Sequence, residues 1–328
     1  MIAAVLVSLL AAAQGYGGTF ARRLTSVEEV AKLSASDESA FDSLGTTVAI
    51  FGDTIVVGAY GDNDENSNEG AAYVFSATTY AQVAKLVASD GDSSDEFGNA
   101  VAIYEETIVV GARYDDDRGI NAGAAYVFSS KTYGQLAKLT ASDGSEYDYF
   151  GWSVAIFDRT IVVGSIFDDG KYENAGAVYV FDASTYAQLC KLTASDGGDS
   201  DYFGYAVAIF NNTIVVGSSR DDDVDFDAGA VYVFERCVQV AKLTASDANR
   251  EARLGETVAI FDDTIVAGAR YADVDDVNNE GAAYVFRYSG SAYVQLAKLT
   301  ASDGGANHWF GRSVAIRGNT IVVGATGR

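Results

Sequence analysis

The amino-acid sequence predicts an all-β protein, a six-bladed β-propeller of four-stranded antiparallel blades, closed by a blade shared between the N- and C-termini. Three observations predict this fold: a repeat of about 50 residues, four β-rich segments in each repeat, and complementary deficits at the two chain ends. A period of this length is typical of solenoids, propellers and related arrays. The clearest marker is a glycine that follows Phe or Leu, found at Gly45, Gly98, Gly151, Gly204, Gly255 and Gly311.

The four strands of a blade are clearest in the third complete copy. Residues 153–157 form a short apolar strand, and the turn-prone pair 158–159 predicts a tight hairpin into residues 161–164. This second strand is apolar on both faces, so we expect it to be buried. An acidic loop precedes the third strand, 177–181, and the fourth, 188–195, mixes Lys, Gln and Leu as an outer edge strand does. Four strands repeated radially form a propeller, in which each blade packs on its neighbours.

The two ends of the chain supply complementary parts of one more blade. Residues 17–36 align with the third and fourth strands, and the residues after Gly311 align with the first and second. Joining these parts in one blade would close the ring and remove free sheet edges. The alternative is that the chain is a fragment of a longer array.

The first residues form an apolar run that ends in three alanines, which predicts a signal peptide at residues 1–13. The run is too short to span a bilayer. The alternative is an altered second strand at residues 2–6. We therefore expect one propeller domain at 17–328, secreted or located at the cell surface. Asn211, in the sequon Asn-Asn-Thr on a predicted turn, is a candidate glycosylation site.

Composition limits the partners of the chain. It has 46 acidic and 22 basic side chains and a net charge of −24, so we expect no nucleic acid or anionic membrane partner. We expect a monomer without a stable membrane span. The two cysteines, Cys190 and Cys237, have an even offset that places them on the same face of successive outer strands. Stacked blades present opposite faces to each other, so no disulfide is predicted.

The motifs F-G-x-S-V-A-I, T-I-V-V-G-A and G-A-A-Y-V-F resemble the FG-GAP repeat, the propeller repeat of integrin α-subunit heads and of many secreted proteins. The resemblance covers about residues 17–328. Two features depart from the family: the proline of G-A-P is absent, and two-residue turns replace the calcium loop that integrins carry between strands one and two. Membership implies extracellular binding or adhesion. A fold does not by itself fix a function.

The sequence favours binding over catalysis. The one histidine, His308, stands where other copies have aspartate, and no copy departs from the repeat to build a distinct active site. We therefore predict a non-catalytic, adhesion-type propeller that recognises a protein or glycan through its acidic face. The alternatives are a calcium-dependent hydrolase acting on lactones or phosphoesters, and a purely structural cell-surface protein.

The loops after the second strands are rich in oxygen ligands of the kind calcium prefers. Calcium is the one cofactor the sequence suggests, and turn formation by the same residues is the competing interpretation. The candidate ligands are Asp62, Asp64, Asn68, Asp115, Asp117, Asn121, Asp168, Asn174, Asp221, Asp223, Asp227, Asp273, Asp275 and Asn279. The aspartate of A-S-D, after each fourth strand, lies on the same face, and we expect it to form hydrogen bonds within its turn.

One position varies within an otherwise constant frame. It follows the glycine of F/L-G and precedes a small residue and V-A-I, at the start of the innermost strand. Variation there marks a place that blade packing does not dictate, and Trp, Tyr, Arg and Glu are typical of recognition sites. The predicted ligand-binding residues are Thr46, Asn99, Trp152, Tyr205, Glu256 and Arg312. The competing interpretation is an exposed position that simply drifts.

Overall fold

The computed structural model describes residues 4–5, 29–37, 39, 41–63, 68–275 and 277–327. Within these ranges the regular structure is entirely β-strand, arranged as five four-stranded antiparallel sheets and two two-stranded ones. This confirms the predicted all-β class and the four strands of each complete repeat. No helix among the described residues is long and apolar enough to cross a membrane.

The five complete sheets pair their strands in chain order. Their bounds are β3 (Val48–Phe51), β4 (Thr54–Ala59), β5 (Ala71–Ser76) and β6 (Gln82–Leu86); β7 (Phe97–Tyr104), β8 (Thr107–Ala112), β9 (Ala124–Ser129) and β10 (Gln135–Leu139); β11 (Phe150–Phe157), β12 (Thr160–Ser165), β13 (Ala177–Asp182) and β14 (Gln188–Leu192); β15 (Phe203–Phe210), β16 (Thr213–Ser218), β17 (Ala230–Glu235) and β18 (Val238–Leu243); β19 (Thr257–Phe261), β20 (Thr264–Ala269), β21 (Ala282–Tyr288) and β22 (Tyr293–Leu299). The two short sheets pair β1 (Ala4–Val5) with β2 (Lys32–Leu33), and β23 (Ser313–Arg317) with β24 (Thr320–Gly324).

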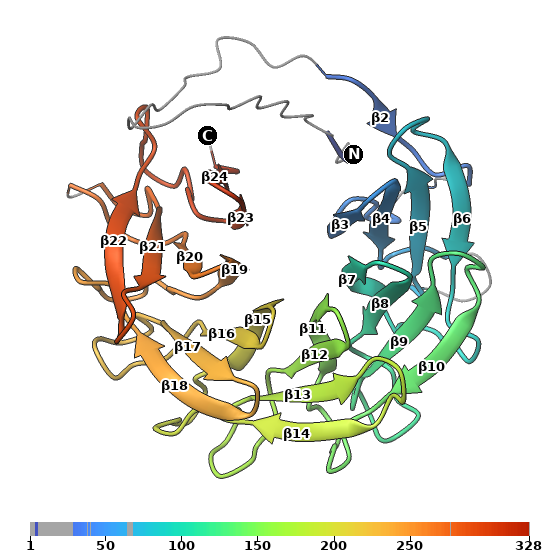
Figure 1. The fold of residues 1–328 in the computed structure, drawn as a ribbon, viewed down its shortest axis with the longest axis horizontal. Coiled ribbons are helices and arrows are strands. Elements are labelled where there is room, and N and C mark those ends of the chain that lie inside the picture. Colours follow the sequence, from blue (N-terminus) through green and yellow to red (C-terminus); the bar gives the residue numbers. More distant parts are fainter. Residues whose placement is uncertain are drawn as a thin grey trace.

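The sheets follow one another around a common axis, and the first strand of each lies nearest to it (Figure 1). The hairpins between first and second strands are the predicted two-residue turns, as in the pairing of Phe157 with Thr160. Second strands are almost completely buried, whereas fourth strands alternate between exposed and half-buried positions. Because the four strands of each sheet are antiparallel and pair in chain order, the loops after the second and fourth strands emerge on one face, which we call the loop face. The hairpins after the first and third strands emerge on the opposite face, the hairpin face.

The hydrophobic core is divided among the interfaces between neighbouring sheets. One cluster joins Val109, Val127 and Leu139 of the second sheet to Phe150 and Tyr179 of the third. Clusters of the same composition lie between the other pairs. No sheet can bury both of its apolar faces alone, so the repeats stabilise one another.

A chain of aromatic rings lies at the C-terminal ends of the first strands, on the hairpin face. Consecutive ring centroids lie 4.9, 4.7, 5.0 and 4.9 Å apart, within the range of favourable aromatic contacts. The rings belong to Phe51, Tyr104, Phe157, Phe210 and Phe261. The equivalent position of β23 is Arg317.

The strand that pairs with β2 comes from an unexpected segment. Ala4 lies opposite Leu33 and Val5 opposite Lys32, the register that third and fourth strands have elsewhere, as in Ala72 opposite Leu86. The predicted fourth strand within residues 17–36 is therefore present at β2. The predicted third strand near residues 19–20 lies outside the described residues. The predicted signal peptide, residues 1–13, also lies outside the described residues, except for β1.

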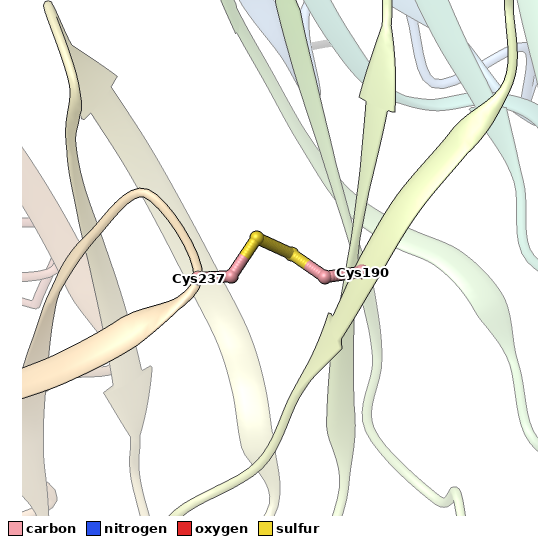
Figure 2. Close-up of a disulfide and its surroundings, with 2 residues drawn as sticks. All are labelled: Cys190 and Cys237. Carbon is pink, nitrogen blue, oxygen red and sulfur yellow. A yellow bond between two sulfur atoms is a disulfide. The ribbon is translucent and has the colours of Figure 1, made fainter.

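The prediction of unpaired cysteines is wrong. Cys190 and Cys237 form a disulfide between the third and fourth sheets, with Cα atoms 6.4 Å apart (Figure 2). The even-offset argument assumed that Cys237 lies in a regular strand. It lies instead in the two-residue turn before β18, and a register shift between Ala241 and Gln239 interrupts the alternation of β18. Cys190, on β14, packs toward the core of the fourth sheet, so the turn brings the two sulfurs together.

Candidate functional site

The start of each first strand is held by close backbone contacts. Gly151 has a φ of 92°, and a Cβ there would lie 2.1 Å from the carbonyl oxygen of Ala124. Only glycine fits such a position without strain. Between Phe150 and Ser153 the pairing with β12 shifts, so Gly151 and Trp152 bulge out of the ladder. The same shift frames Asn99 in β7 and Tyr205 in β15. A bulge re-aims its side chain, which explains why this position can vary.

Four of the six predicted ligand-binding residues lie in one connected group. We call these four residues and two arginines that contact them the axial cluster. Its members are Asn99, Trp152, Tyr205, Glu256, Arg113 and Arg270. The Asn99 amide donates hydrogen bonds of 3.1 Å to the carbonyl oxygens of Gly151 and Trp152. The Arg113 guanidinium lies 4.7 Å from the Trp152 ring centroid and forms an ion pair with Glu96.

The cluster continues from Trp152 into the next two blades. The Trp152 and Tyr205 rings lie 5.5 Å apart at an angle of 56°. The Tyr205 hydroxyl lies 3.4 Å from Glu256 Oε1, which also forms a 2.7 Å ion pair with Arg270. Burial raises the pKa of Glu256, and the nearby guanidinium groups of Arg270 and Arg253 oppose that rise. Adjacent aromatics were predicted here, and the structure places them in contact.

The other two predicted residues are separate from this group. Thr46 and Arg312 are exposed and lie just before β3 and β23 respectively. The Thr46 hydroxyl donates to the Ser43 carbonyl at 2.7 Å, and the Arg312 side chain has no hydrogen bond or ion pair among the described residues. Among the described residues, no hydrogen bond, ion pair or ring contact joins either of them to the axial cluster.

Further from the axis, the loop face carries a repeated network of tyrosine, lysine and aspartate. In the second blade the Tyr126 hydroxyl donates to Asp115 at 2.6 Å, and Lys138 forms ion pairs with Asp115, Asp117 and Asp90. Burial lowers the pKa of Lys138, but hydrogen bonds with the three carboxylates outweigh it and raise the pKa. The first, third and fourth blades repeat this arrangement around Lys85, Lys191 and Lys242.

These outer networks account for several predicted calcium ligands and for the A-S-D aspartates. Asp62, Asp115, Asp168 and Asp221 are nearly fully buried, and each is paired with a lysine and a tyrosine. The A-S-D aspartates face the lysine of the following blade, a stronger partner than the expected turn amides. Burial raises their pKa, but the lysine hydrogen bond and charge outweigh it, so the pKa of Asp143 is lowered.

The remaining predicted ligands form turns. Residues of one set adopt left-handed backbone conformations with φ between 50° and 54°, and their carbonyls accept hydrogen bonds from the backbone of the next blade. They are Asn68, Asn121, Asn174, Asp227 and Asn279. Asp117 and Asp223 face lysines, and Asp273 accepts from the Asn279 amide at 2.8 Å. Asp275 lies in a turn, and Asp64 lies outside the described residues.

Within the described part of the chain, no group of three or more His, Cys, Asp or Glu side chains is arranged to hold a metal ion. Because the carboxylates already have lysine, tyrosine or amide partners, the geometry favours turn formation and charge pairing for them. Calcium binding stays a prediction. The imidazole of His308 has no hydrogen bond to a described residue, which offers no support for a catalytic role.

A second set of aspartates is buried and forms no ion pair with a described residue. Asp95, Asp148 and Asp201 each accept a hydrogen bond from a backbone amide three residues earlier. Burial raises the pKa of Asp95 to about 7 and the pKa values of Asp148 and Asp201 to about 6. The hydrogen bond from the backbone amide opposes this rise in each case. These carboxylates lie in the loops that lead into the first strands.

Sequence reasoning missed the arginines and further aromatics that surround the axial cluster. They occupy three other variable positions: the two residues after G-A or G-S, and the residue before F/L-G. Tyr114, Tyr149, Phe167 and Tyr202 form a run of ring contacts between 4.9 and 5.0 Å. The comparison between copies that found Trp152 would also have found these positions.

A family model described as FG-GAP repeat matches the chain six times, at residues 27–75, 80–128, 133–181, 186–234, 237–286 and 293–328. No curated protein sequence matches the chain.

Proposed function

Because this chain belongs to the FG-GAP repeat family, we propose that it is a closed six-bladed propeller, exported from the cell, that binds a protein or glycan without catalysis. The observation that carries the proposal is the axial cluster. Side chains of the types common in recognition sites gather at a backbone bulge. The fold does not dictate which residue occupies this bulge, whereas the residues on either side of it are repeated in the other blades.

Exposed apolar side chains on β3 and β24 support closure. Ile50 on β3 is 54% exposed, whereas its counterpart Ile156 is 8% exposed. Val322 on β24 is 52% exposed, whereas Val162 is completely buried. Joining β23 and β24 to β2 in one blade would bury these side chains as the other blades do. Leu33 already packs on the first blade and Ile321 on the fifth.

Two unpaired charges also support closure. Each complete blade pairs its fourth-strand lysine with the A-S-D aspartate that precedes the blade, as Lys85 pairs with Asp37. Among the described residues, Lys32 lacks such an aspartate and Asp303 lacks such a lysine. In a closed ring these two residues occupy equivalent positions and can form the sixth pair.

The disulfide and the sequon support export. Disulfides persist in oxidising compartments and are rare in the cytosol. Asn211 lies in an exposed hairpin turn, where a glycan can be accommodated.

Closure is tested by exchanging charges. Lys32→Glu should lower the melting temperature, and Lys32→Glu with Asp303→Lys should recover most of the loss. A melting temperature independent of protein concentration, with a monomeric mass in light scattering, is expected for closure within one chain. No recovery in the double variant would contradict the predicted pair.

Binding is tested by presenting the disulfide-bonded protein to arrays of glycans and of secreted proteins. Trp152→Ala should weaken binding to whichever ligand is found, and Arg159→Ala, on the hairpin face, should not. Loss of binding in the Arg159 variant alone would place recognition on the opposite face. An absence of any ligand for the folded protein would favour a structural role.

A further inference from the structure

An excess of positive charge lies beside the axial cluster, between the fourth and fifth blades. Arg220, Arg253 and Arg270 all act on the charge of one carboxylate, that of Glu256, and Arg253 and Arg270 lie over the same aromatic ring. Arg270 forms an ion pair with it at 2.7 Å, whereas Arg220 and Arg253 have no ion-pair partner among the described residues. Elsewhere on the loop face carboxylates outnumber cationic side chains, since Lys138 alone faces three carboxylates.

The site is largely shielded from solvent. The side chains of Glu256 and Arg270 are 5% and 13% exposed. Three buried polar atoms of these side chains have no hydrogen-bond partner among the described residues: Arg253 Nε, Arg270 Nε and Glu256 Oε2. Arg220 and Arg253, which have no such ion pair, are half-buried, and a partly desolvated charge gains from a charged partner. A negatively charged group that binds here would supply that partner.

Aromatic stacking leaves the guanidinium edges available for planar recognition. Arg253 and Arg270 lie 5.0 and 4.6 Å from the centroid of the same ring, Tyr271, and Arg220 lies 4.6 Å from that of Tyr202. A guanidinium stacked by its face donates from its edge, in the fork geometry that matches a carboxylate.

Two features of the surroundings select the rest of the ligand. The half-buried rings of Trp152 and Tyr205 are continuous with Glu256 and can pack on the apolar C–H face of a sugar ring. The outer loops carry many aspartates, so an extended polyanion would be repelled. A neutral saccharide with a single carboxylate satisfies both conditions.

We propose that Arg220 and Arg253 bind the carboxylate of an acidic sugar whose ring packs on Trp152 and Tyr205. This inference rests on the proposed binding function. The same group could reach the site as a free uronic acid or as the terminal unit of a glycan, and the test separates these sources.

The probes are methyl β-D-glucuronide, its uncharged methyl ester, methyl β-D-glucoside, and a neutral oligosaccharide ending in glucuronate. Calorimetry with the folded protein should detect the two acidic probes, and the ester and glucoside should bind at least about tenfold more weakly. Tighter binding of the oligosaccharide would identify a terminal unit, and equal binding a free sugar acid. Equal affinity for glucuronide and glucoside, or no binding of either acidic probe, would overturn the inference.

Protein variants provide the second arm. Arg253→Gln and Arg220→Gln should each weaken glucuronide binding at least about tenfold, while Arg159→Gln should not change it. Sodium acetate and sodium sulfate serve as competitors. If acetate binds with the same affinity as glucuronide, the site recognises any carboxylate and the sugar assignment is wrong. If sulfate displaces glucuronide more strongly than acetate does, the carboxylate assignment is wrong. A neutral ligand on the glycan array that depends on Trp152 but not on Arg253 would leave the proposed function intact and contradict this inference.

Discussion

The outer networks and the axial cluster lie on the same face of the molecule and differ in almost every respect. The network around Lys191 repeats that around Lys85 nearly atom for atom, with one lysine shared by two or more carboxylates. The axial cluster has a different side chain in each blade and more guanidinium groups than carboxylates around Glu256. Repetition marks the contacts that join blades, and variation marks the place left free for recognition.

The largest expected effect is on the outer networks. Lys138→Ala would leave Asp115, whose side chain is 2% exposed, buried without a cation. Breaking such a pair from one side should lower the free energy of unfolding by about 3–5 kcal/mol, measured by urea denaturation.

The fifth blade supplies the matched control for this change. There Ala272 replaces the buried aspartate, and among the described residues Lys298 has one ion-pair partner, the half-exposed Asp247. Lys298→Ala should therefore cost less than about 1 kcal/mol. Equal losses in the two variants would mean that the lysines act by packing on tyrosine rings, since Lys138 and Lys298 lie 5.1 and 5.8 Å from their ring centroids.

A second stability effect is expected at the disulfide, which joins two blades on the side away from the axial cluster. Replacing Cys190 and Cys237 by alanine opens a link between residues separated by 47 positions. The loss should be about 2–4 kcal/mol, because the unfolded chain regains the entropy of an open loop. Calorimetric melting of the two forms measures it. Ligand affinity at the axial cluster should not change; a loss of affinity in the folded double variant would show that the two regions are coupled.

The sequence predicted the part of the molecule that repetition controls. Strand order, two-residue hairpins and buried second strands follow from alternation and turn residues seen in every copy. It failed where one blade departs from the rest. Cys237 lies in a shortened turn whose position depends on a register shift in β18, and the arginines around Glu256 come from three loops that only the fold brings together.

The buried aspartates between the two regions should give stability an unusual pH dependence. Burial raises the pKa of Asp148 from its ordinary value of 3.8 to about 6, so the folded state binds more protons than the unfolded state between these values. Stability should therefore fall as pH rises from about 4 to about 7. Below pH 4 the trend should reverse, because the lowered pKa of Asp143 gives stability that protonation removes.

Asp148→Asn tests this assignment. The amide oxygen can still accept from the Ser145 backbone, and the cost of an ionised buried carboxylate disappears. The variant should be more stable than the parent by about 1–3 kcal/mol at pH 8 and similar to it near pH 4. Melting temperatures across this pH range provide the measurement. A pH profile parallel to that of the parent would show that Asp148 is not the group that titrates.

Only a small effect on stability is expected at the axial cluster itself, and two residues at the start of one strand allow a direct comparison. Phe150 is fully buried between the second and third blades, so Phe150→Ala should cost about 3–5 kcal/mol. Trp152, two residues later, is half-buried and contacts Tyr205 and Arg113 rather than the core. Trp152→Ala should cost only about 1 kcal/mol, the usual value of one ring contact and one cation–π contact. Urea denaturation of both variants, with glucuronide binding measured on the folded Trp152 variant, completes the comparison. A loss at Trp152 as large as at Phe150 would mean that the axial cluster stabilises the fold, and its variation between blades would then need a structural explanation.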